Sequence, residues 1–119
     1  MKKVLVVLTV LALTILPLTA LAAEGPMKLP SGAKQEAVSH NKEGIASWNK
    51  KDYKGALMHF SAASKIDGSS GEIHFNEAIC YDKIGQHGVA TKHFGVALKK
   101  AGGNTKLLNS PILKGHLGM

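Results

Sequence analysis

Histidine is the residue type in this sequence whose chemistry stands out. Six histidines occur among 119 residues, and the neutral imidazole ring is a common transition-metal ligand that also titrates near neutral pH. They stand at His40, His59, His74, His87, His93 and His116. A set of this kind can bind a metal ion or take part in acid–base chemistry.

The spacing of the histidines does not fit a metal site built on a single helix. Such a site places two histidines on one helical face, as in H-x-x-x-H, and no pair in this sequence has that spacing. His87 and His93 are six residues apart and point in different directions. Two hypotheses stay open. Either each histidine packs at a helix interface with a satisfied ring nitrogen, which the spacing favours, or some of them bind metal.

Other catalytic patterns are missing from the sequence as well. It has no G-x-S-x-G motif, its eight carboxylates are scattered, and its single cysteine, Cys80, has no evident base partner. One cysteine cannot form an internal disulfide, and no C-x-x-C-H haem motif occurs. We therefore expect a protein without enzyme activity or cofactor, in which Cys80 packs inside as a small hydrophobic residue.

The start of the chain, over 1–22, has the layout of a secretory signal peptide. Two lysines precede an almost unbroken apolar run from Val4 to Leu16, and Ala20-Leu21-Ala22 provides an A-x-A cleavage site. This run is shorter than the roughly 20 residues that a membrane-spanning helix needs. We expect export across the inner membrane to the periplasm or cell envelope, with the membrane involved only through this signal.

Proline and glycine then mark a short linker. The stretch from Glu24 to Gly32 contains two prolines and two glycines, a composition typical of a flexible tether. The expected organisation is a signal peptide over residues 1–22, a flexible linker over 23–34 and a helical domain over 35–119.

The basic charge of the chain comes from lysine alone. The formal net charge is +7, and no arginine occurs. Recognition of guanine or phosphate favours the planar fork of arginine, so we expect no nucleic-acid partner. A lysine excess fits a solvated surface or a weak preference for acidic partners.

Beyond the linker, helical spacing and an internal repeat appear. Short turns separate four helical segments, which predicts antiparallel neighbours. The stretch ALMHFSAA at 56–63 returns further along the chain as ATKHFGVA at 90–97. Shifting the chain by the same period gives nine identities, which pair His40 with His74, Glu43 with Glu77, Ile45 with Ile79, Ala56 with Ala90, His59 with His93, Phe60 with Phe94, Ala63 with Ala97, Lys65 with Lys99 and Gly68 with Gly102. We infer two copies of one structural unit, over 37–70 and 71–104.

This period, with two helices per unit, resembles that of the tetratricopeptide repeat (TPR), whose units are about 34 residues long. The small residues of that family, which let helices cross closely, match Gly44, Ala56 and Ala63 in the first unit and Ala78, Ala90 and Ala97 in the second. Its interhelical aromatic matches Phe60 and Phe94. The resemblance implies an all-α fold of antiparallel helix-turn-helix repeats, of the α-solenoid type. The tail over 105–119 is expected to fold back as a broken capping helix around Ser110-Pro111.

The resemblance also implies an inner, concave groove that binds protein partners. The positions that line this groove in the family are Val38, Asn41, Ile45, Trp48, Glu72, Phe75, Ile79 and Asp82. We predict that Trp48 and Phe75 anchor a partner segment, because core packing should not need large aromatics there. The alternative is that the linker or the tail covers this face. A carboxylate clamp is not expected, since Asn41 and Ile45 stand where that clamp has lysine and asparagine.

The sequence thus predicts an exported, non-catalytic TPR scaffold that binds a protein or peptide segment through its groove. Two alternatives remain open. One is a small histidine-dependent metal-binding protein. The other is a self-assembling homo-oligomer in which open repeat ends stack on one another.

Overall fold

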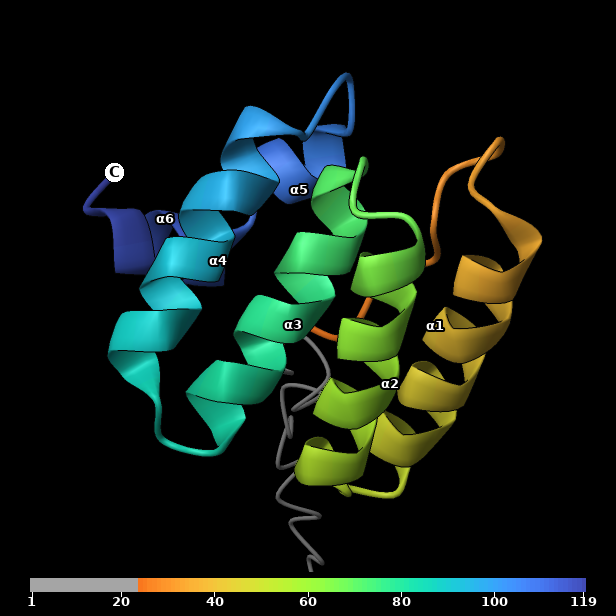
Figure 1. Ribbon diagram of the computed structural model, residues 1–119. Coiled ribbons are helices and arrows are strands. Elements are labelled where there is room, and N and C mark those ends of the chain that lie inside the picture. Colours follow the sequence, from red (N-terminus) through yellow and green to blue (C-terminus); the bar gives the residue numbers. More distant parts are fainter. Residues whose placement is uncertain (1–23) are drawn as a thin grey trace, which may run out of the picture.

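Six helices and no strand make up residues 24–119, the part of the chain that this computed structural model describes (Figure 1). The helices are α1 (Gln35–Asn49), α2 (Tyr53–Ile66), α3 (Gly71–Lys83), α4 (His87–Lys99), α5 (Thr105–Leu108) and α6 (Pro111–Leu117). None of the helices within this range is long and apolar enough to cross a membrane. The signal peptide predicted for 1–22 lies outside the described residues.

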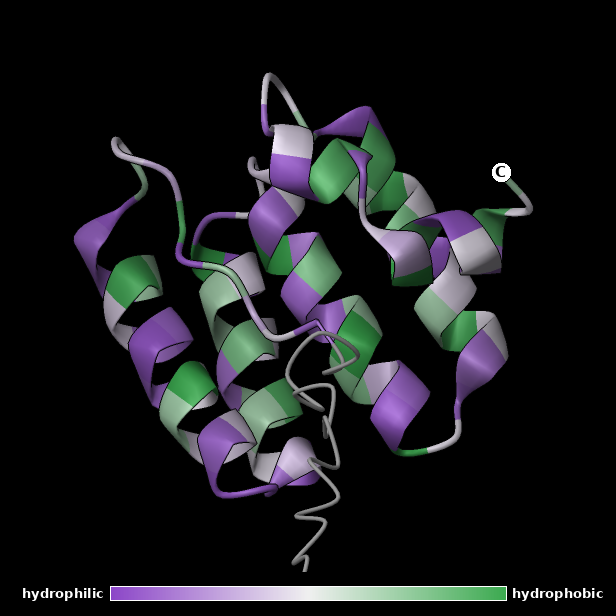
Figure 2. Ribbon diagram, turned by 180° about the vertical axis from the view of Figure 1, so that it is seen from behind, coloured by the Kyte–Doolittle hydropathy of each residue, from purple (hydrophilic) through white to green (hydrophobic). Residues whose placement is uncertain are grey.

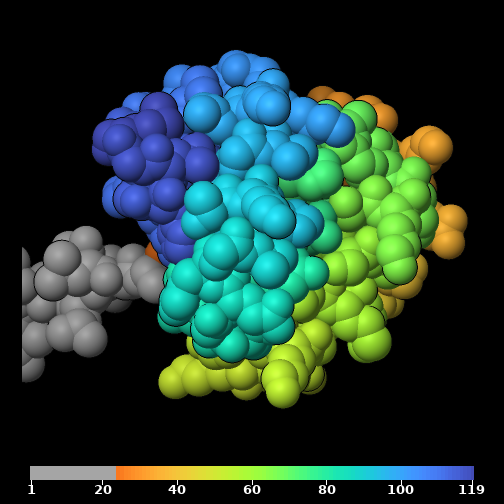
Figure 3. Space-filling model, turned by 60° about the vertical axis from the view of Figure 1, so that its left-hand side comes forward, coloured from red at the N-terminus to blue at the C-terminus, as the bar shows by residue number. Residues whose placement is uncertain are grey.

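The helices are arranged as two antiparallel pairs and a tail. α1 packs on α2, α3 packs on α4, and α2 joins the pairs by packing on α3, so the four lie side by side (Figure 1). The short helices α5 and α6 pack on the second pair, and Figure 3 shows the blue tail lying closely against it. The predicted all-α fold of helix-turn-helix units is confirmed.

Side-chain caps fix where several helices begin. The Asp52 side chain accepts a hydrogen bond from the Gly55 amide at the start of α2, at 2.9 Å. Ser70, Asn104 and Ser110 cap α3, α5 and α6 in the same way. Each cap satisfies an amide that the helix itself leaves without an acceptor. The capped helices are too short to be stable alone, so the stability of these helices comes from packing against one another.

Small residues allow the two helices of each pair to approach closely. Phe60 and Phe94 are fully buried, as are the alanines at the equivalent crossings in both units. A Cβ atom added at Gly44 would lie 2.5 Å from Cε1 of Phe60, so the ring occupies the space that a side chain there would need. Gly71 is equally tight, because its added Cβ would lie 2.5 Å from the Ala97 carbonyl oxygen.

The interior is divided into two clusters of buried residues. The first gathers Phe60, Ile73 and Cys80 with three alanines, between the first pair and α3. The second joins α3, α4, the tail and Met27. Cys80 is buried, as predicted, and burial raises the pKa of its thiol to about 12. Cys80 is therefore a neutral packing residue at physiological pH.

The segment before α1 is docked on the helices. The sequence predicted a flexible linker over 23–34, whereas residues 24–30 cross the inner face of the helix layer in an extended form, as Figure 2 shows from behind. Met27 is only 6% exposed and packs into the second cluster. The Ser110 hydroxyl donates a hydrogen bond to the Glu24 carboxylate, which ties the start of this segment to the tail. Burial of Met27 and these polar contacts account for the difference.

Candidate functional site

Two asparagines hold the backbone of the docked segment on the inner face. The Asn76 side chain accepts a hydrogen bond from the Met27 amide at 2.7 Å and donates one to the Met27 carbonyl at 2.7 Å. Asn41 also donates to this carbonyl, at 3.0 Å, and accepts from Asn76 at 2.8 Å. These bonds recognise a peptide backbone rather than a side chain. The inner face therefore binds an extended segment, and in this structure the segment is the chain's own.

The predicted groove residues of the second unit all have partners within the chain. Phe75 is fully buried and packs edge-on against Phe94, with 5.6 Å between ring centroids, and Ile79 is buried in the same cluster. Glu72 accepts a hydrogen bond from Asn104, and Asp82 lies within hydrogen-bond distance of two histidines. The expectation that Phe75 is an exposed anchor is therefore wrong, because the docked segment and the tail make this position part of the core.

Trp48 in the first unit is also partly enclosed. Its ring packs against both interior clusters and meets Tyr53 edge-on, with 4.8 Å between centroids. The ammonium group of Lys83 lies 5.9 Å from the centroid of the indole ring, within the range of a cation–π contact. Trp48 thus joins the two units, and its contacts are those of a packing residue.

The open part of the inner face is a hollow beside α1. We call it the α1 hollow. It has a volume of about 260 Å³ and is lined by Lys28, Leu29, Val38, Asn41, Lys42 and Ile45. Leu29, Val38 and Ile45 are half-buried apolar residues, whereas the two lysines are exposed. Three predicted groove residues therefore meet here, and the docked segment contributes a wall that the sequence did not indicate.

The histidines come together in three groups, each with one carboxylate, among residues 24–119. We call them the first-unit group (His40, Glu43, His59), the second-unit group (His74, Glu77, His93) and the tail group (Asp82, His87, His116). In each group the three ligand-type atoms lie within 4.8 Å of one another. Sequence spacing missed these groups because each joins residues of two or three different helices, whereas the H-x-x-x-H rule concerns one helix. The signal that could have found two of them is the return of histidine, glutamate and histidine together at the repeat period.

The tail group is a set of hydrogen bonds that attaches α6 to the second helix pair. One oxygen of Asp82 lies 2.8 Å from His87 Nδ1 and 2.8 Å from His116 Nε2. Burial raises the pKa of Asp82, but hydrogen bonds from both histidines outweigh this effect, so the net pKa is lowered. Thr91 Oγ1 lies 2.9 Å from the other nitrogen of the His116 ring. The group connects α6 to α3 and α4, and its Asp82 oxygen and histidine nitrogens already lie at hydrogen-bond distances from one another.

The other two groups are less well satisfied. In the second-unit group, Glu77 Oε1 lies 3.5 Å from His74 Nδ1 and 3.9 Å from His93 Nδ1. The Glu77 carboxylate raises the pKa of His74, whereas burial lowers the pKa of His93. Neither Glu77 Oε1 nor His93 Nδ1 has a hydrogen-bond partner among the described residues. Packing therefore leaves one buried ring nitrogen of His93 without a partner within residues 24–119.

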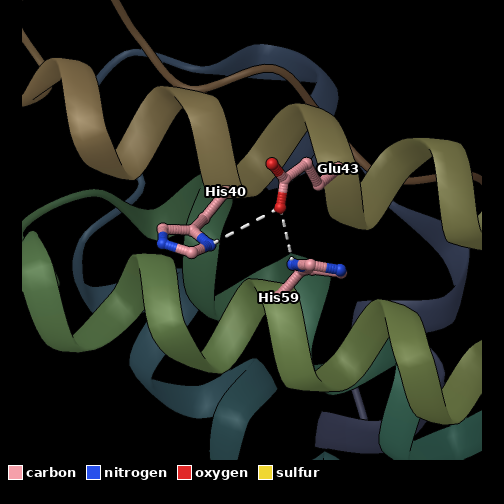
Figure 4. A group of neighbouring side chains, drawn as sticks. All are labelled: His40, Glu43 and His59. Carbon is pink, nitrogen blue, oxygen red and sulfur yellow. Dashed lines mark ion pairs between the residues drawn. The ribbon is translucent and has the colours of Figure 1, made fainter.

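The first-unit group repeats this arrangement at the surface. Figure 4 shows one oxygen of Glu43, on α1, facing both His40 from the same helix and His59 from α2. The distances are 3.0 Å to His59 Nδ1 and 3.8 Å to His40 Nδ1. The Glu43 side chain is 58% exposed, compared with 7% for Glu77. The two units therefore carry the same residues in the same places but at different depths.

Comparison with known proteins agrees with a helical repeat. No family model matches the chain. The chain is 39% identical over 64 residues to Sperm-associated antigen 1 of Homo sapiens, a protein that contains TPR units. The match covers 54% of this chain and 7% of that protein. This similarity and the paired helices support a repeat scaffold of the kind that mediates protein–protein interaction in general.

Proposed function

We propose that this chain is an exported, non-catalytic TPR-like scaffold that binds a segment of a partner protein in the α1 hollow. The observation that carries the proposal is the inner face itself. It already holds an extended backbone through Asn41 and Asn76, and it leaves an apolar hollow beside that backbone. A surface built in this way suits a second peptide segment that lies along α1 and inserts one side chain.

The size and the lining of the hollow define the partner's chemistry. Its volume of about 260 Å³ lies below the roughly 300–1,000 Å³ of sites that enclose small-molecule ligands. It therefore suits a single large apolar side chain better than a cofactor. Lys28 and Lys42 are exposed at its edge, so acidic residues beside the inserted side chain would be favoured. The net charge, which is +7 for the full sequence and +5 without Lys2 and Lys3 of the signal peptide, adds attraction for an acidic partner over longer distances.

Binding of a model peptide tests this proposal directly. The probe is a fluorescent peptide in which one leucine is flanked by glutamates, titrated with the purified chain. We expect Val38→Asp to weaken binding by about tenfold or more, because it places a charge inside an apolar hollow. Met58→Asp is the matched control, since Met58 is 65% exposed on α2 and does not line the hollow.

Peptide variants complete the test. Replacement of the leucine by alanine should remove the apolar anchor, and replacement of the glutamates by lysines should remove the charge complementarity. Lys42→Glu should then weaken binding of the glutamate-flanked peptide and strengthen binding of the lysine-flanked peptide. Equal affinity for the leucine and alanine peptides, or equal loss in Val38→Asp and Met58→Asp, would rule out the α1 hollow as the binding site.

Export is a separate part of the proposal and has a separate test. It rests on the charged start, the short apolar run and the A-x-A pattern within residues 1–22. We expect the chain recovered from the cell envelope or periplasmic fraction to begin after Ala22, as mass spectrometry would show. A full-length chain that remains with the cytoplasmic fraction would contradict export and leave the peptide-binding test unaffected.

A further inference from the structure

The second-unit group has the arrangement of a metal-binding site. We propose that it binds a divalent transition metal ion of the zinc type through His74 Nδ1, Glu77 Oε1 and His93 Nδ1, and that the first-unit group forms a weaker copy. Two imidazoles and one carboxylate are a common donor set for Zn²⁺, and three protein ligands leave a position for water or another group. This function is distinct from peptide binding in the α1 hollow.

The distances between the ligand atoms fit an ion better than they fit hydrogen bonds. Glu77 Oε1 lies 3.5 Å and 3.9 Å from the two ring nitrogens, beyond the roughly 2.7–3.2 Å of an N–H···O bond. Bond lengths of about 2.0–2.2 Å to a tetrahedral Zn²⁺ place neighbouring ligand atoms roughly 3.3–3.6 Å apart. Glu77 Oε1 is within a few tenths of an ångström of this separation from both ring nitrogens, and all three atoms lie within 4.8 Å of one another, so side-chain rotations could bring them into one coordination shell.

Atoms without partners point to the same ion. Glu77 is only 6% exposed, and its Oε1 has no hydrogen-bond partner among residues 24–119. His93 Nδ1, which faces this oxygen, also has none within that range. A buried carboxylate oxygen without a partner is destabilising, and a nearby imidazole lone pair cannot relieve it. A cation between them would stabilise both atoms at once.

The residues around the group hold the ligands in a suitable orientation. His74 Nε2 lies 2.8 Å from the Gly68 carbonyl oxygen, which can only accept, so Nε2 carries a hydrogen. In the neutral ring, Nδ1 then has a lone pair that faces Glu77 and is free to bind an ion. Orientation of a histidine ligand by a backbone carbonyl is a frequent feature of metal sites. The Tyr81 ring stacks on His93 with 5.0 Å between centroids, and Ser61 donates to the second oxygen of Glu77.

Comparison with the other groups sets the expected order of affinity. In the first-unit group, His40 Nδ1 is likewise buried without a partner among the described residues. Its Glu43 is exposed and therefore more mobile and better solvated, which should weaken binding. In the tail group, both histidines already lie 2.8 Å from the same Asp82 oxygen, so an ion would have to displace existing hydrogen bonds. The expected order is second-unit group, then first-unit group, with no site in the tail group.

The first-unit group and the α1 hollow lie on opposite sides of α1, and the second-unit group lies on α3 and α4. Val38 and Ile45 line the hollow, whereas His40 and Glu43 point toward α2. Substitutions in one place should therefore leave the other unchanged. The two proposed functions can in this way fail independently.

Zinc titration of the purified protein tests the inference. The protein is used in the form that is recovered from cells, with or without residues 1–22. Competition with a chromogenic chelator measures affinity and stoichiometry, and the visible spectrum of bound Co²⁺ reports the coordination geometry. We expect one tight and one weaker site per chain. His93→Gln should weaken the tight site by more than about 100-fold, since even outer-shell partners contribute about 10–100-fold in affinity. His59→Gln should remove only the weaker site, and His87→Gln, in the tail group, is the matched control.

Glu77→Gln separates a metal site from an internal ion pair. It preserves shape but removes the charge, and helical circular dichroism would check that each variant folds. A metal site predicts that stoichiometric Zn²⁺ raises the Tm of the unmodified chain and that Glu77→Gln removes most of this increase, leaving only the part due to the weaker site. Absence of stoichiometric Zn²⁺ binding, equal losses in His93→Gln and His87→Gln, or a Tm that does not respond to Zn²⁺ would overturn the inference.

Discussion

The two helical units share a repeat but differ in how far each is enclosed. In α3, nine residues of 13 are buried, whereas in α1 only three of 15 are buried. α3 lies between the first pair and the tail, with the docked segment over its inner face, whereas α1 stands at the open end of the layer (Figure 1). The place of a unit in the stack, together with its local sequence, therefore decides what its residues can do.

This difference gives equivalent residues different roles. The α1 hollow stays open beside Val38, Asn41 and Ile45 of the first unit. In the second unit, by contrast, the core contains Phe75 and Ile79. The same contrast separates the two repeat-encoded histidine groups, of which only the second is deeply set. We infer that the first unit offers a surface to a partner protein and that the second offers a rigid, buried set of ligands.

The largest effect is expected from removing the aromatic ring of the second unit. Phe94→Ala should lower the free energy of unfolding by about 3–5 kcal/mol, because it leaves a cavity in a fully buried place. The Phe94 ring also lies 4.9 Å from the ring of His116, so α6 should lose protection from hydrogen exchange. Urea denaturation and amide exchange would measure both effects.

The equivalent change in the first unit tests whether this coupling to the tail is specific. Phe60→Ala should cost a similar free energy, since Phe60 is equally buried, but it should leave α6 protected in the native state. Equal loosening of α6 in both variants would show that the two units unfold as one body, contrary to the distinction drawn between them.

A smaller loss is expected where the helices of the first pair cross. Gly44→Ala should destabilise the protein by about 1–3 kcal/mol, because the new Cβ would lie 2.5 Å from the Phe60 ring. Gly95→Ala on α4 is the matched control: nothing lies within 4 Å of its added Cβ. It should stabilise the helix by up to about 1 kcal/mol. Thermal unfolding would give opposite shifts in Tm, and a stabilising Gly44→Ala would contradict the close crossing.

Release of the docked segment should have a comparable or smaller effect. Asn76→Ala removes two of the three side-chain hydrogen bonds to the Met27 backbone and should lower stability by about 1–3 kcal/mol. Asn41→Ala removes one bond to the same residue and should have a smaller effect. Limited proteolysis between residues 24 and 34 should accelerate in the same order. Unchanged proteolysis in Asn76→Ala would mean that the remaining contacts, which are Met27 packing and the bonds from Asn41 and Ser110, are enough to hold the segment.

The fold could be predicted because its determinants recur in the sequence. Small residues and one phenylalanine stand at the crossings of both units, and the structure buries them as expected. The docked segment could not be predicted in the same way, because proline and glycine composition reports local flexibility and not the presence of a receptive surface. Its anchor is one methionine held through its backbone, for which no residue pattern exists.

The candidate sites were predicted only in part. The groove positions came from the resemblance, and three of them line the α1 hollow, but their availability depended on the tail and the docked segment. The histidine groups were not predicted because a spacing rule for one helix cannot detect ligands that different helices bring together. His59 and Glu43 stand on different helices, separated by a turn, yet His59 Nδ1 lies 3.0 Å from the Glu43 carboxylate.

The smallest effect concerns acid and the attachment of the tail. The net pKa of Asp82 is lowered, because hydrogen bonds from His87 and His116 outweigh the burial that raises it. A carboxyl group whose pKa is lower in the folded than in the unfolded state stabilises the fold at pH values above its unfolded-state pKa, which is 3.8 for Asp82. This stabilisation is lost as the pH falls from there through the folded-state pKa. We therefore expect α6 to lose hydrogen-exchange protection as the pH falls below about 4.

Asp82→Asn should reduce α6 protection already at neutral pH and remove its further decrease in acid. Asp67 provides the comparison on the other side of the layer. Its pKa is lowered to about 2, first by the Ser69 side chain and then by backbone amides including that of Lys34, and these hydrogen-bond partners lie outside the tail. Asp67→Asn should change stability over the same acid range without altering α6. If both variants release α6 equally, acid would act on the whole fold rather than on the tail group.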